Sequence, residues 1–587
     1  MKWNGRTRCA LVCLGFTALF SIFSYRLVYL QVVRHDAYVD LAGKQNSKRD
    51  VIYAERGLIY DRNDAVLALN DPVETVEADP SHIKDPAALI PVLAAALEMP
   101  PEKIAEKLNR GGKYVVLRND FPEASAVALQ KELRTKKLAG IRFKRDFIRR
   151  YPNDSLLCHV IGFSDYEHKG IQGVEATMNR YLRGEDGFRE TERDPAGNEI
   201  PLYRGTERPP HNGYNVHLTI DLNLQNIVEN ELDAAREKYT PKKATAILMR
   251  PETGEILAMA SRPNYDLNKR NKAKDEQMKN RAIIDMMEPG STFKIVTVGA
   301  ALNEKLVTLE TPIFCENGPW RFGGSYLHDH KYYGLIPVQD VLVKSSNIGA
   351  AKIALMLGDE KFFEYIRRFG FGQTTGIELP GEIAGLIHPP RTWSKISISR
   401  IPMGHEVGVT PLQMALAMCA IANGGKLVAP RIVKSIVDEN GVVKSELKPI
   451  VLRRVISEDA AAKMALALRG VVSDRGTAKE ATVPGFTISG KTGTAQKVDP
   501  EHPGYLKGKE IVSFSGFLPS EHPAFVGLVV LDEAHTKTAE ENYGGKVAGP
   551  IFARIAAQAA RYLNLEPQEK IEKPDAADRV ALTNADR

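Results

Sequence analysis

A single long apolar run, Cys9–Val33, lies close to the N-terminus, and Arg26 is its one charged interruption. As one helix, the run would be about 37 Å long, which is enough to span a bilayer with some tilt. Arg26, near the outer end, can reach the headgroups. A cleaved signal peptide is the alternative, but no Ala-x-Ala-like site follows the run. We therefore predict that residues 9–33 form a transmembrane anchor.

Basic residues set the expected orientation of this anchor. Lys2, Arg6 and Arg8 precede the run, and basic residues near a membrane span are kept on the cytoplasmic side. Residues 1–8 are therefore predicted to be cytoplasmic. No second apolar segment of similar length follows, which predicts a single-pass protein with a large extracytoplasmic part.

The composition is that of an ordinary folded protein. Of 587 residues, 43% are hydrophobic and 26% are charged, so we expect two to four folded domains. The net charge of +6 is spread along the chain, which argues against a dedicated nucleic-acid binder. The five cysteines show no metal-type spacing, so neither a disulfide framework nor a zinc site is predicted; they are Cys9, Cys13, Cys158, Cys315 and Cys419.

Residues 34–215 are predicted to form a separate domain. Periodicity favours helices over Leu89–Leu108 and Glu123–Leu133, and Arg56–Asn63 is typical of a strand bounded by a turn. The segment offers no pairing of a nucleophile with a base. Its charges are best explained as a solvated face with structural ion pairs, so we predict a scaffold, or pedestal, domain.

Residues 216–564 are predicted to form a second domain that mixes strands with helices. Val216–Asp221 is strand-like and leads into a helix over Leu224–Tyr239; Ala244–Met249 and Glu255–Ala260 flank a glycine turn and predict an antiparallel hairpin. Helical runs continue through Leu416. Further strands are predicted near Lys426 and at Phe486–Ser489, Ile511–Leu518 and Phe525–Leu531, with a closing helix at Ile551–Leu563. This order predicts an α/β (α+β) fold with an antiparallel sheet flanked by helices. Residues 565–587 are charged and poor in apolar groups, and we predict a disordered tail.

Within the second domain, Glu288–Lys294 marks the start of a helix. Residues three apart on a helix share a face, so the Ser291 hydroxyl and the Lys294 amine can meet. Lysine can remove the serine proton only when it is neutral, and burial or a second positive charge favours that form. Ser-x-x-Lys also arises by chance on surface helices. A serine nucleophile is therefore predicted only if a second cation lies close by.

Two further segments meet this condition. Lys491–Thr494 follows a predicted strand and supplies the cation, and its glycine permits a substrate backbone to approach closely. Lys344–Asn347 begins another predicted helix. There, Ser345 could relay a proton, and the Asn347 amide could hold Lys294 and a substrate carbonyl. Taken alone, Ser345 is better explained as a helix N-cap.

Ser-x-x-Lys, Ser-x-Asn and Lys-Thr-Gly, in this order, resemble the three motifs of penicillin-recognising serine enzymes. The chain as a whole resembles the class B penicillin-binding proteins, which are peptidoglycan D,D-transpeptidases, and most of all their cell-division type, penicillin-binding protein 3. The resemblance extends to Arg56–Arg62, Gly170–Glu175 and Val409–Gln413. Two places depart from the family's pattern: Gly404–Gly408 is bulkier and more polar than usual, and Asp64 stands where glycine is common.

This resemblance implies acyl transfer without a metal or cofactor. The implied catalytic residues are Ser291 as nucleophile, Lys294 as base, Ser345, Asn347 and Lys491; the implied substrate-binding residues are Thr492, Gly493 and Thr494. The backbone N–H groups of Ser291 and Thr494 would hold the oxyanion. His405 and Glu406 receive no role from the resemblance.

The resemblance also implies a location and partners. The catalytic domain would lie in the periplasm, tethered to the bacterial cytoplasmic membrane. It would act on stem peptides ending in D-Ala-D-Ala and would bind β-lactams, but not nucleic acid. An integral-membrane glycan polymerase and division proteins are the implied protein partners, and Asn347, where many elongation-type relatives carry Asp, favours septal wall synthesis. An elongation-type transpeptidase, a penicillin-sensing receptor and an idle scaffold are the alternatives.

Overall fold

The computed structural model describes residues 4–38, 47–110, 114–193, 199–499, 502, 504–538 and 541–568. The chain divides into two compact units. The first unit comprises residues 1–55, 72–148 and 184–213, and the second comprises residues 56–71, 149–183 and 214–587. The predicted disordered tail, 565–587, lies outside the described residues from position 569 onward.

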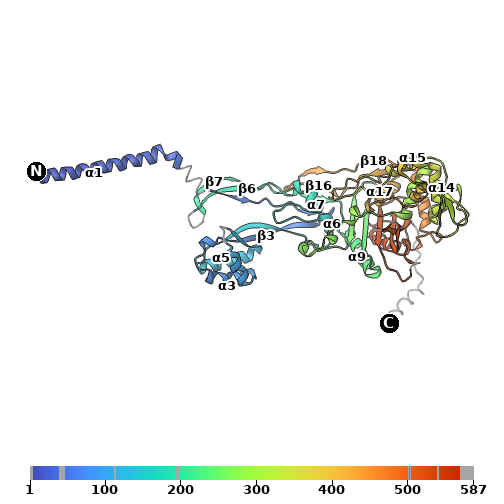
Figure 1. Ribbon diagram of the computed structural model, residues 1–587, viewed down its shortest axis with the longest axis horizontal. Coiled ribbons are helices and arrows are strands. Elements are labelled where there is room, and N and C mark those ends of the chain that lie inside the picture. Colours follow the sequence, from blue (N-terminus) through green and yellow to red (C-terminus); the bar gives the residue numbers. More distant parts are fainter. Residues whose placement is uncertain are drawn as a thin grey trace, which may run out of the picture. The chain divides into compact units, whose positions relative to one another are not determined.

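The N-terminal run forms one helix, as predicted. α1 spans Gly5–Val28 and continues as a π-helical turn, η1 (Tyr29–Val33), to give a helix of 29 residues (Figure 1). Within the described part of the chain it is the one helix long and apolar enough to cross a membrane. At 1.5 Å per residue it is about 43 Å long, which fits a single-pass anchor.

The first unit contains a three-stranded antiparallel sheet and a small helical subdomain. The sheet has the order β1-β6-β7 (Ser47–Ile52, Gly187–Arg193 and Glu199–Arg208). The subdomain contains α3 (Pro86–Leu97), α4 (Pro101–Asn109), α5 (Glu123–Thr135), β4 (Val115–Pro122), most of β5 (Ile141–Arg150) and the C-terminal half of β3 (Val66–Ala78). Its apolar core includes Val76, Leu93, Ile104, Leu117 and Leu129.

One predicted helix of this subdomain is two helices. The prediction of a single periodic segment, Leu89–Leu108, is wrong because Glu98 ends α3 in the left-handed conformation, with φ 51°. Pro100 and Pro101 follow, and proline cannot continue a helix that precedes it. Pro101 instead begins α4. The predicted helix Glu123–Leu133 is confirmed as α5.

The predicted strand Arg56–Asn63 is shorter than expected. β2 is only Ile59–Tyr60, because Asp61 closes a turn and its Oδ1 accepts hydrogen bonds from the N–H groups of Asn63 (2.7 Å) and Ala65 (2.8 Å). Asp64 in this turn has φ 66°, a conformation that glycine adopts more easily than any other residue. That preference gives a physical reason for the family's glycine at this position.

Arg56, Arg149 and Glu175 form a buried ion network in the second unit. Arg56 Nε lies 2.6 Å from one carboxylate oxygen of Glu175, and Arg149 Nε lies 2.7 Å from the other. Burial acts to raise the pKa of the Glu175 carboxyl, but the charges of Arg149 and Arg56 hold this pKa below its ordinary value. These charges are structural ion pairs, as predicted, but they are buried and do not form the predicted solvated face.

The second unit is built on a five-stranded antiparallel sheet of order β10-β9-β21-β20-β19. Its strands are β9 (Lys243–Met249), β10 (Ile256–Arg262), β19 (Ser489–Val498), β20 (Tyr505–Leu518) and β21 (Phe525–Asp532). The longer helices that contact the sheet are α9 (Leu222–Tyr239), α17 (Pro411–Ala422), α18 (Glu458–Val471) and α19 (Ala548–Tyr562). The predicted hairpin, closing helix and α+β class are confirmed.

A separate sheet of this unit pairs β2 with β8 (Asn215–Leu218), then β16 (Val433–Val437) and β17 (Val443–Glu446).

A helical subdomain lies between β10 and β15 (Lys426–Val428). Its main helices are α12 (Lys294–Asn303), α13 (Val338–Val343), α14 (Asn347–Leu357) and α15 (Asp359–Arg368). Two small pairs of strands accompany them: β11 with β14 (Pro312–Phe314, Leu335–Pro337) and β12 with β13 (Trp320–Phe322, Ser325–Leu327). The prediction of helical runs through Leu416 is wrong over residues 370–389, where no helix occurs. Glycines with positive φ interrupt that stretch; they are Gly370, Gly372, Gly376, Gly381 and Gly385.

Candidate active site

Ser291 lies in a 3-10 turn, η4 (Gly290–Phe293), that leads directly into α12. Gly290 has φ 56°, and a Cβ at this position would lie 2.7 Å from the carbonyl oxygen of Thr494 in β19. Only glycine therefore lets this turn pack so closely against the sheet. The predicted helix start at Ser291 is confirmed.

The amine of Lys294 is buried one turn later, with no exposed surface. Its Nζ lies 3.1 Å from Ser291 Oγ, 2.5 Å from the Ser345 carbonyl oxygen, 3.2 Å from Ser345 Oγ and 2.8 Å from Asn347 Oδ1. A neutral amine has two N–H groups and one lone pair. The Ser345 carbonyl and the Asn347 amide can accept the two N–H groups, which leaves the lone pair for the Ser291 hydroxyl.

Burial also sets the protonation of this amine. It lowers the pKa of Lys294 to about 7, while the charge of Asp329 acts to raise it. Transfer of an ammonium group out of water disfavours the charged form. A neutral amine is therefore available beside Ser291 near neutral pH.

Ser345 sits in a strained turn before α14. Its φ of 58° is uncommon for a residue with a side chain, and such strain concentrates at functional sites. The N-cap explanation of Ser345 is wrong, because the cap of α14 is Ser346, whose Oγ accepts a hydrogen bond from Gly349 N at 2.9 Å. Ser345 Oγ instead lies between two amines, 3.2 Å from Lys294 Nζ and 3.0 Å from Lys491 Nζ.

Lys491–Thr494 lie within β19, the edge strand of the five-stranded sheet. They were expected after a strand at Phe486–Ser489, and that prediction is wrong. Val483 and Phe486 form the isolated bridge of a tight turn, and the strand begins only at Ser489. The outer side of an edge strand carries unpaired backbone groups, which can bind an extended peptide.

Lys491 is as deeply buried as Lys294. Burial, followed by the charge of Lys294, lowers the pKa of Lys491 well below its ordinary value. For Lys294 itself, burial is the largest cause of the lowered pKa, which confirms the predicted effect of burial. The predicted second amine is thus present, and burial is the main cause of the lowered pKa of both lysines.

The residues after Lys491 shape the contact between β19 and the Ser291 turn. A Cβ on Gly493 would lie 2.3 Å from Ser513 Oγ and 3.0 Å from the carbonyl oxygen of Pro289. Thr492 Oγ1 lies 3.0 Å from Thr477 Oγ1, and Thr494 Oγ1 accepts a hydrogen bond from Gly544 N at 3.2 Å. Direct contacts thus join the five predicted catalytic side chains, and the three predicted substrate-binding residues adjoin them on the strand edge.

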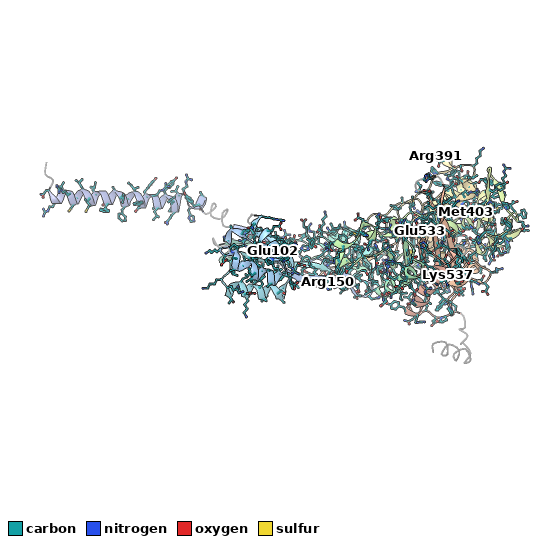
Figure 2. The ribbon with its side chains drawn as sticks, turned by 60° about the horizontal axis from the view of Figure 1, so that its bottom comes forward. Glu102, Arg150, Arg391, Met403, Glu533 and Lys537 are labelled. Atoms are coloured by element: carbon teal, nitrogen blue, oxygen red, sulfur yellow. The ribbon has the colours of Figure 1, made fainter. Side chains whose placement is uncertain are left out.

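The divergent segment Gly404–Gly408 packs against the turn that carries Ser291. Met403, labelled in Figure 2, ends the short helix η6 (Ile401–Met403) just before it. A Cβ on Gly404 would lie 2.2 Å from the carbonyl oxygen of Gly290. The N–H of Glu406 donates to Glu288 Oε1 at 2.9 Å. The segment therefore supports the loop that precedes the nucleophile.

His405 belongs to the same support. Its Nε2 lies 4.0 Å from Glu288 Oε2, and its ring meets the Tyr505 ring edge-on with centroids 5.7 Å apart. Burial, followed by the charges of Arg400 and Lys294, lowers the pKa of His405 to about 4. His405 is therefore neutral at physiological pH, and these contacts place it beside Glu288 rather than on the Ser291 hydroxyl.

Glu406 adopts a left-handed backbone with φ 60°, so we expect Glu406→Gly to stabilise the protein. A left-handed residue with a Cβ costs roughly 1–2 kcal/mol, part of which is offset by the greater freedom of glycine in the unfolded chain. The net gain in the free energy of unfolding should be up to about 1 kcal/mol, measured by urea denaturation. Glu446→Gly, in the exposed strand β17, is the control and should destabilise by about 0.5–1 kcal/mol. An equal loss in both variants would contradict the strain at Glu406.

One residue of the site, Asp329, was not predicted. It lies between β13 and β14 and is 8% exposed, and its Oδ2 accepts a hydrogen bond from Ser346 Oγ at 2.6 Å. The strand β14 and the helix α13 separate it from Ser346 along the chain. No spacing within the sequence connects it to the three motifs.

Comparison with known proteins supports a single family over both parts of the chain. Residues 244–557 match the penicillin-binding protein transpeptidase domain, and residues 51–218 match the penicillin-binding protein dimerisation domain. The chain is 36% identical to stage V sporulation protein D of Bacillus subtilis over 577 residues, which cover 97% of this chain and 88% of that protein. It is 31% identical to the peptidoglycan D,D-transpeptidase FtsI of Escherichia coli over 574 residues, which cover 97% and 93%.

Solved structures give the same result. Penicillin-binding protein 3 of Mycobacterium tuberculosis, in complex with aztreonam, is similar with a TM-score of 0.70 and 27% identity, covering 89% of this chain and 99% of that one. Penicillin-binding protein 2X of Streptococcus thermophilus, at 24% identity, shares the fold with a TM-score of 0.73 over 88% of this chain and 80% of its own. The chain belongs to the penicillin-binding protein transpeptidase family.

Proposed function

We propose that this protein is a serine D,D-transpeptidase that cross-links peptidoglycan stem peptides through an acyl-enzyme on Ser291. The observation that carries the proposal is the buried Lys294 amine, 3.1 Å from Ser291 Oγ and surrounded by acceptors for its own protons. Relatives such as E. coli FtsI are named peptidoglycan D,D-transpeptidases. Penicillin-binding protein 3 of M. tuberculosis has been solved with aztreonam and with ampicillin, which supports the binding of β-lactams here.

In the first half-reaction, Ser291 Oγ attacks the carbonyl carbon of the penultimate D-Ala, and its proton passes to Lys294 Nζ. The bond to the terminal D-Ala then breaks, and the departing amine takes up a proton. Ser345 Oγ lies 3.2 Å from Lys294 Nζ and 3.0 Å from Lys491 Nζ, so it can pass protons between the base and the leaving group. Free D-Ala leaves, and the remaining stem peptide is an ester on Ser291.

In the second half-reaction, an amine of a neighbouring stem peptide attacks this ester. The amine loses a proton, the new amide bond forms, and Ser291 Oγ recovers its hydrogen. Backbone N–H groups of Ser291 and Thr494 hold the negative oxygen in both steps. Lys491, Thr492 and Thr494 bind the terminal carboxylate of the donor, and Gly493 lets β19 pack closely against the turn that carries Ser291.

An exchange assay tests this function. The protein is incubated with a stem pentapeptide ending in D-Ala-D-Ala and with isotope-labelled D-Ala, and the label in the peptide is measured. We expect incorporation by the wild type and none by Ser291→Ala. A wild type that is acylated by penicillin but never exchanges D-Ala would support a sensor or scaffold instead.

Acylation should rise with pH through the pKa of Lys294. Below about pH 7 the amine is charged and cannot accept the Ser291 proton; above it, the neutral amine can. We expect the second-order rate constant for a fluorescent penicillin to increase about tenfold per pH unit on the acid side and then to level off. A rate that is constant from pH 5 to pH 9 would contradict the assignment of the base.

The N-terminal helix and the family support a role at the septum. Residues 1–8 would be cytoplasmic and the catalytic part extracytoplasmic, beside an integral-membrane glycan polymerase and division proteins. Depletion of the protein in its host should give filaments with blocked septa; rounded cells that still divide would support an elongation role. The Bacillus relative is named for sporulation. If depletion leaves the growth of the host normal but its sporulation defective, a role in sporulation is favoured over a role at the septum.

A further inference from the structure

Among the described residues, Asp329 is the carboxylate that accepts hydrogen bonds from Ser346 and Asn347, in the turn Ser345–Asn347 beside the Lys294 amine. Its Oδ2 accepts the Ser346 hydroxyl at 2.6 Å; its Oδ1 accepts Ile348 N at 3.0 Å and also the N–H of Asn347. These N–H groups lie in the first turn of α14, where unpaired donors and the helix dipole favour a negative charge. Asp329 thus fixes the first turn of α14 from a separate loop.

This turn supplies most of the environment of the Lys294 amine. Three of the four acceptors around Nζ belong to Ser345 or Asn347: a carbonyl, a hydroxyl and an amide oxygen. Ser345 adopts a strained backbone, with φ 58°, and strain persists only where surrounding contacts hold it. Asp329 provides such contacts on the C-terminal side of Ser345, because it binds Ser346 and Asn347.

Charge is the second link between Asp329 and the base. Lys294 and Lys491 are fully buried, and their hydrogen-bond partners are hydroxyls, carbonyls and an amide rather than carboxylates. The charged form of a buried amine is unfavourable without a counter-charge. Asp329 is the carboxylate whose charge acts on Lys294, and it raises the pKa of that amine.

The other titratable groups around the amine are neutral in the working range. Burial raises the pKa of the Cys315 thiol, whose Sγ lies 3.4 Å from Ser346 Oγ. Burial raises the pKa of Tyr333 as well, and His405 is neutral above a pKa of about 4. The charged side chain that shifts the pKa of Lys294 in this range is therefore Asp329.

We propose that Asp329 is a positioning residue that sets the pH range of acylation: it fixes the Ser345–Asn347 turn around the base and supplies the negative charge that offsets the buried lysine pair. This proposal rests on the proposed function, with Lys294 as the base. The two effects of Asp329 can be separated by substitutions that keep its shape or its charge.

The test is the pH profile of acylation by a fluorescent penicillin. Asp329→Asn keeps an oxygen for the two N–H groups of α14 but removes the charge. The acid limb of the profile, where the acylation rate rises with pH, should therefore move to lower pH by at least about half a unit. Asp329→Ser is a second neutral variant with the same expected shift. Asp329→Glu keeps the charge, so its limb should stay near that of the wild type even if its maximal rate falls.

Asp340→Asn is the matched control. Asp340 lies on α13 and pairs with Lys344 at 3.1 Å, so its loss removes a nearby carboxylate without touching the α14 turn. We expect its profile to match that of the wild type. A purely structural role for Asp329 would lower the rate at every pH and leave the limb in place; that result in a folded neutral variant would overturn the proposal. A wild type that is not acylated at Ser291 would instead refute the proposed function.

Discussion

Lys294→Arg should slow the acylation of Ser291 by about 10²- to 10⁴-fold, the usual contribution of a general base, although the positive charge is retained. Arginine stays protonated at any usable pH and cannot accept the serine proton. The lysine amine lies 3.1 Å from Ser291 Oγ, so no other group is needed between base and nucleophile. The measurement is the second-order rate constant for labelling by a fluorescent penicillin at pH 8.

Two variants control for the size of arginine in this buried space. Lys294→Met fills the space of the lysine stem without a base and should be as slow as Lys294→Arg. Lys344→Arg changes a half-buried lysine that is paired with Asp340 and should behave like the wild type. Acylation by Lys294→Arg within tenfold of the wild-type rate would remove Lys294 from the role of base.

Glu175→Gln should lower the free energy of unfolding by about 3–5 kcal/mol, the usual cost of removing one partner from a buried ion pair. The substitution leaves two guanidinium groups, exposed by 0% and 2%, without their shared carboxylate. The measurement is the urea dependence of tryptophan fluorescence. Glu106→Gln breaks an exposed pair with Arg110 on the surface of α4 and should cost no more than about 0.5 kcal/mol.

The same network predicts a dependence on pH. The folded-state pKa of Glu175 is held below its ordinary value, so its contribution to stability is present above the unfolded pKa of about 4.3 and is lost as pH falls through the folded value. The difference between wild type and Glu175→Gln should therefore shrink on acidification below about pH 4. A difference that is constant down to pH 2, or absent at pH 7, would contradict the role of the network.

The parts of the fold that follow from local sequence were predictable. The N-terminal helix is set by a long apolar run, α5 by apolar periodicity, and the β9–β10 hairpin by a glycine turn between two apolar runs. The contact between Ser291 and Lys294 follows from their spacing of three residues on a helix. In each case the deciding interactions lie within a few residues of one another.

The features that were missed depend on contacts between distant segments. Nothing local indicates that Lys491 sits inside an edge strand, since β19 pairs with β20 and completes a sheet begun by β9 and β10. The left-handed turn at Ser345 is held by the cap at Ser346, and Asp329 reaches that cap from another loop. Burial of the Lys294 amine is likewise a property of the folded site, so its extent could not be derived from the motif alone.

The measurement that tests the account most directly is mass spectrometry of the protein after treatment with penicillin. We expect a single adduct of the mass of the opened drug on the peptide that contains Ser291, and no adduct in Ser291→Ala. The Ser345→Ala variant should carry the adduct at the same position but acquire it more slowly. An adduct on Ser345, or one that persists in Ser291→Ala, would contradict the assignment of Ser291 as the nucleophile.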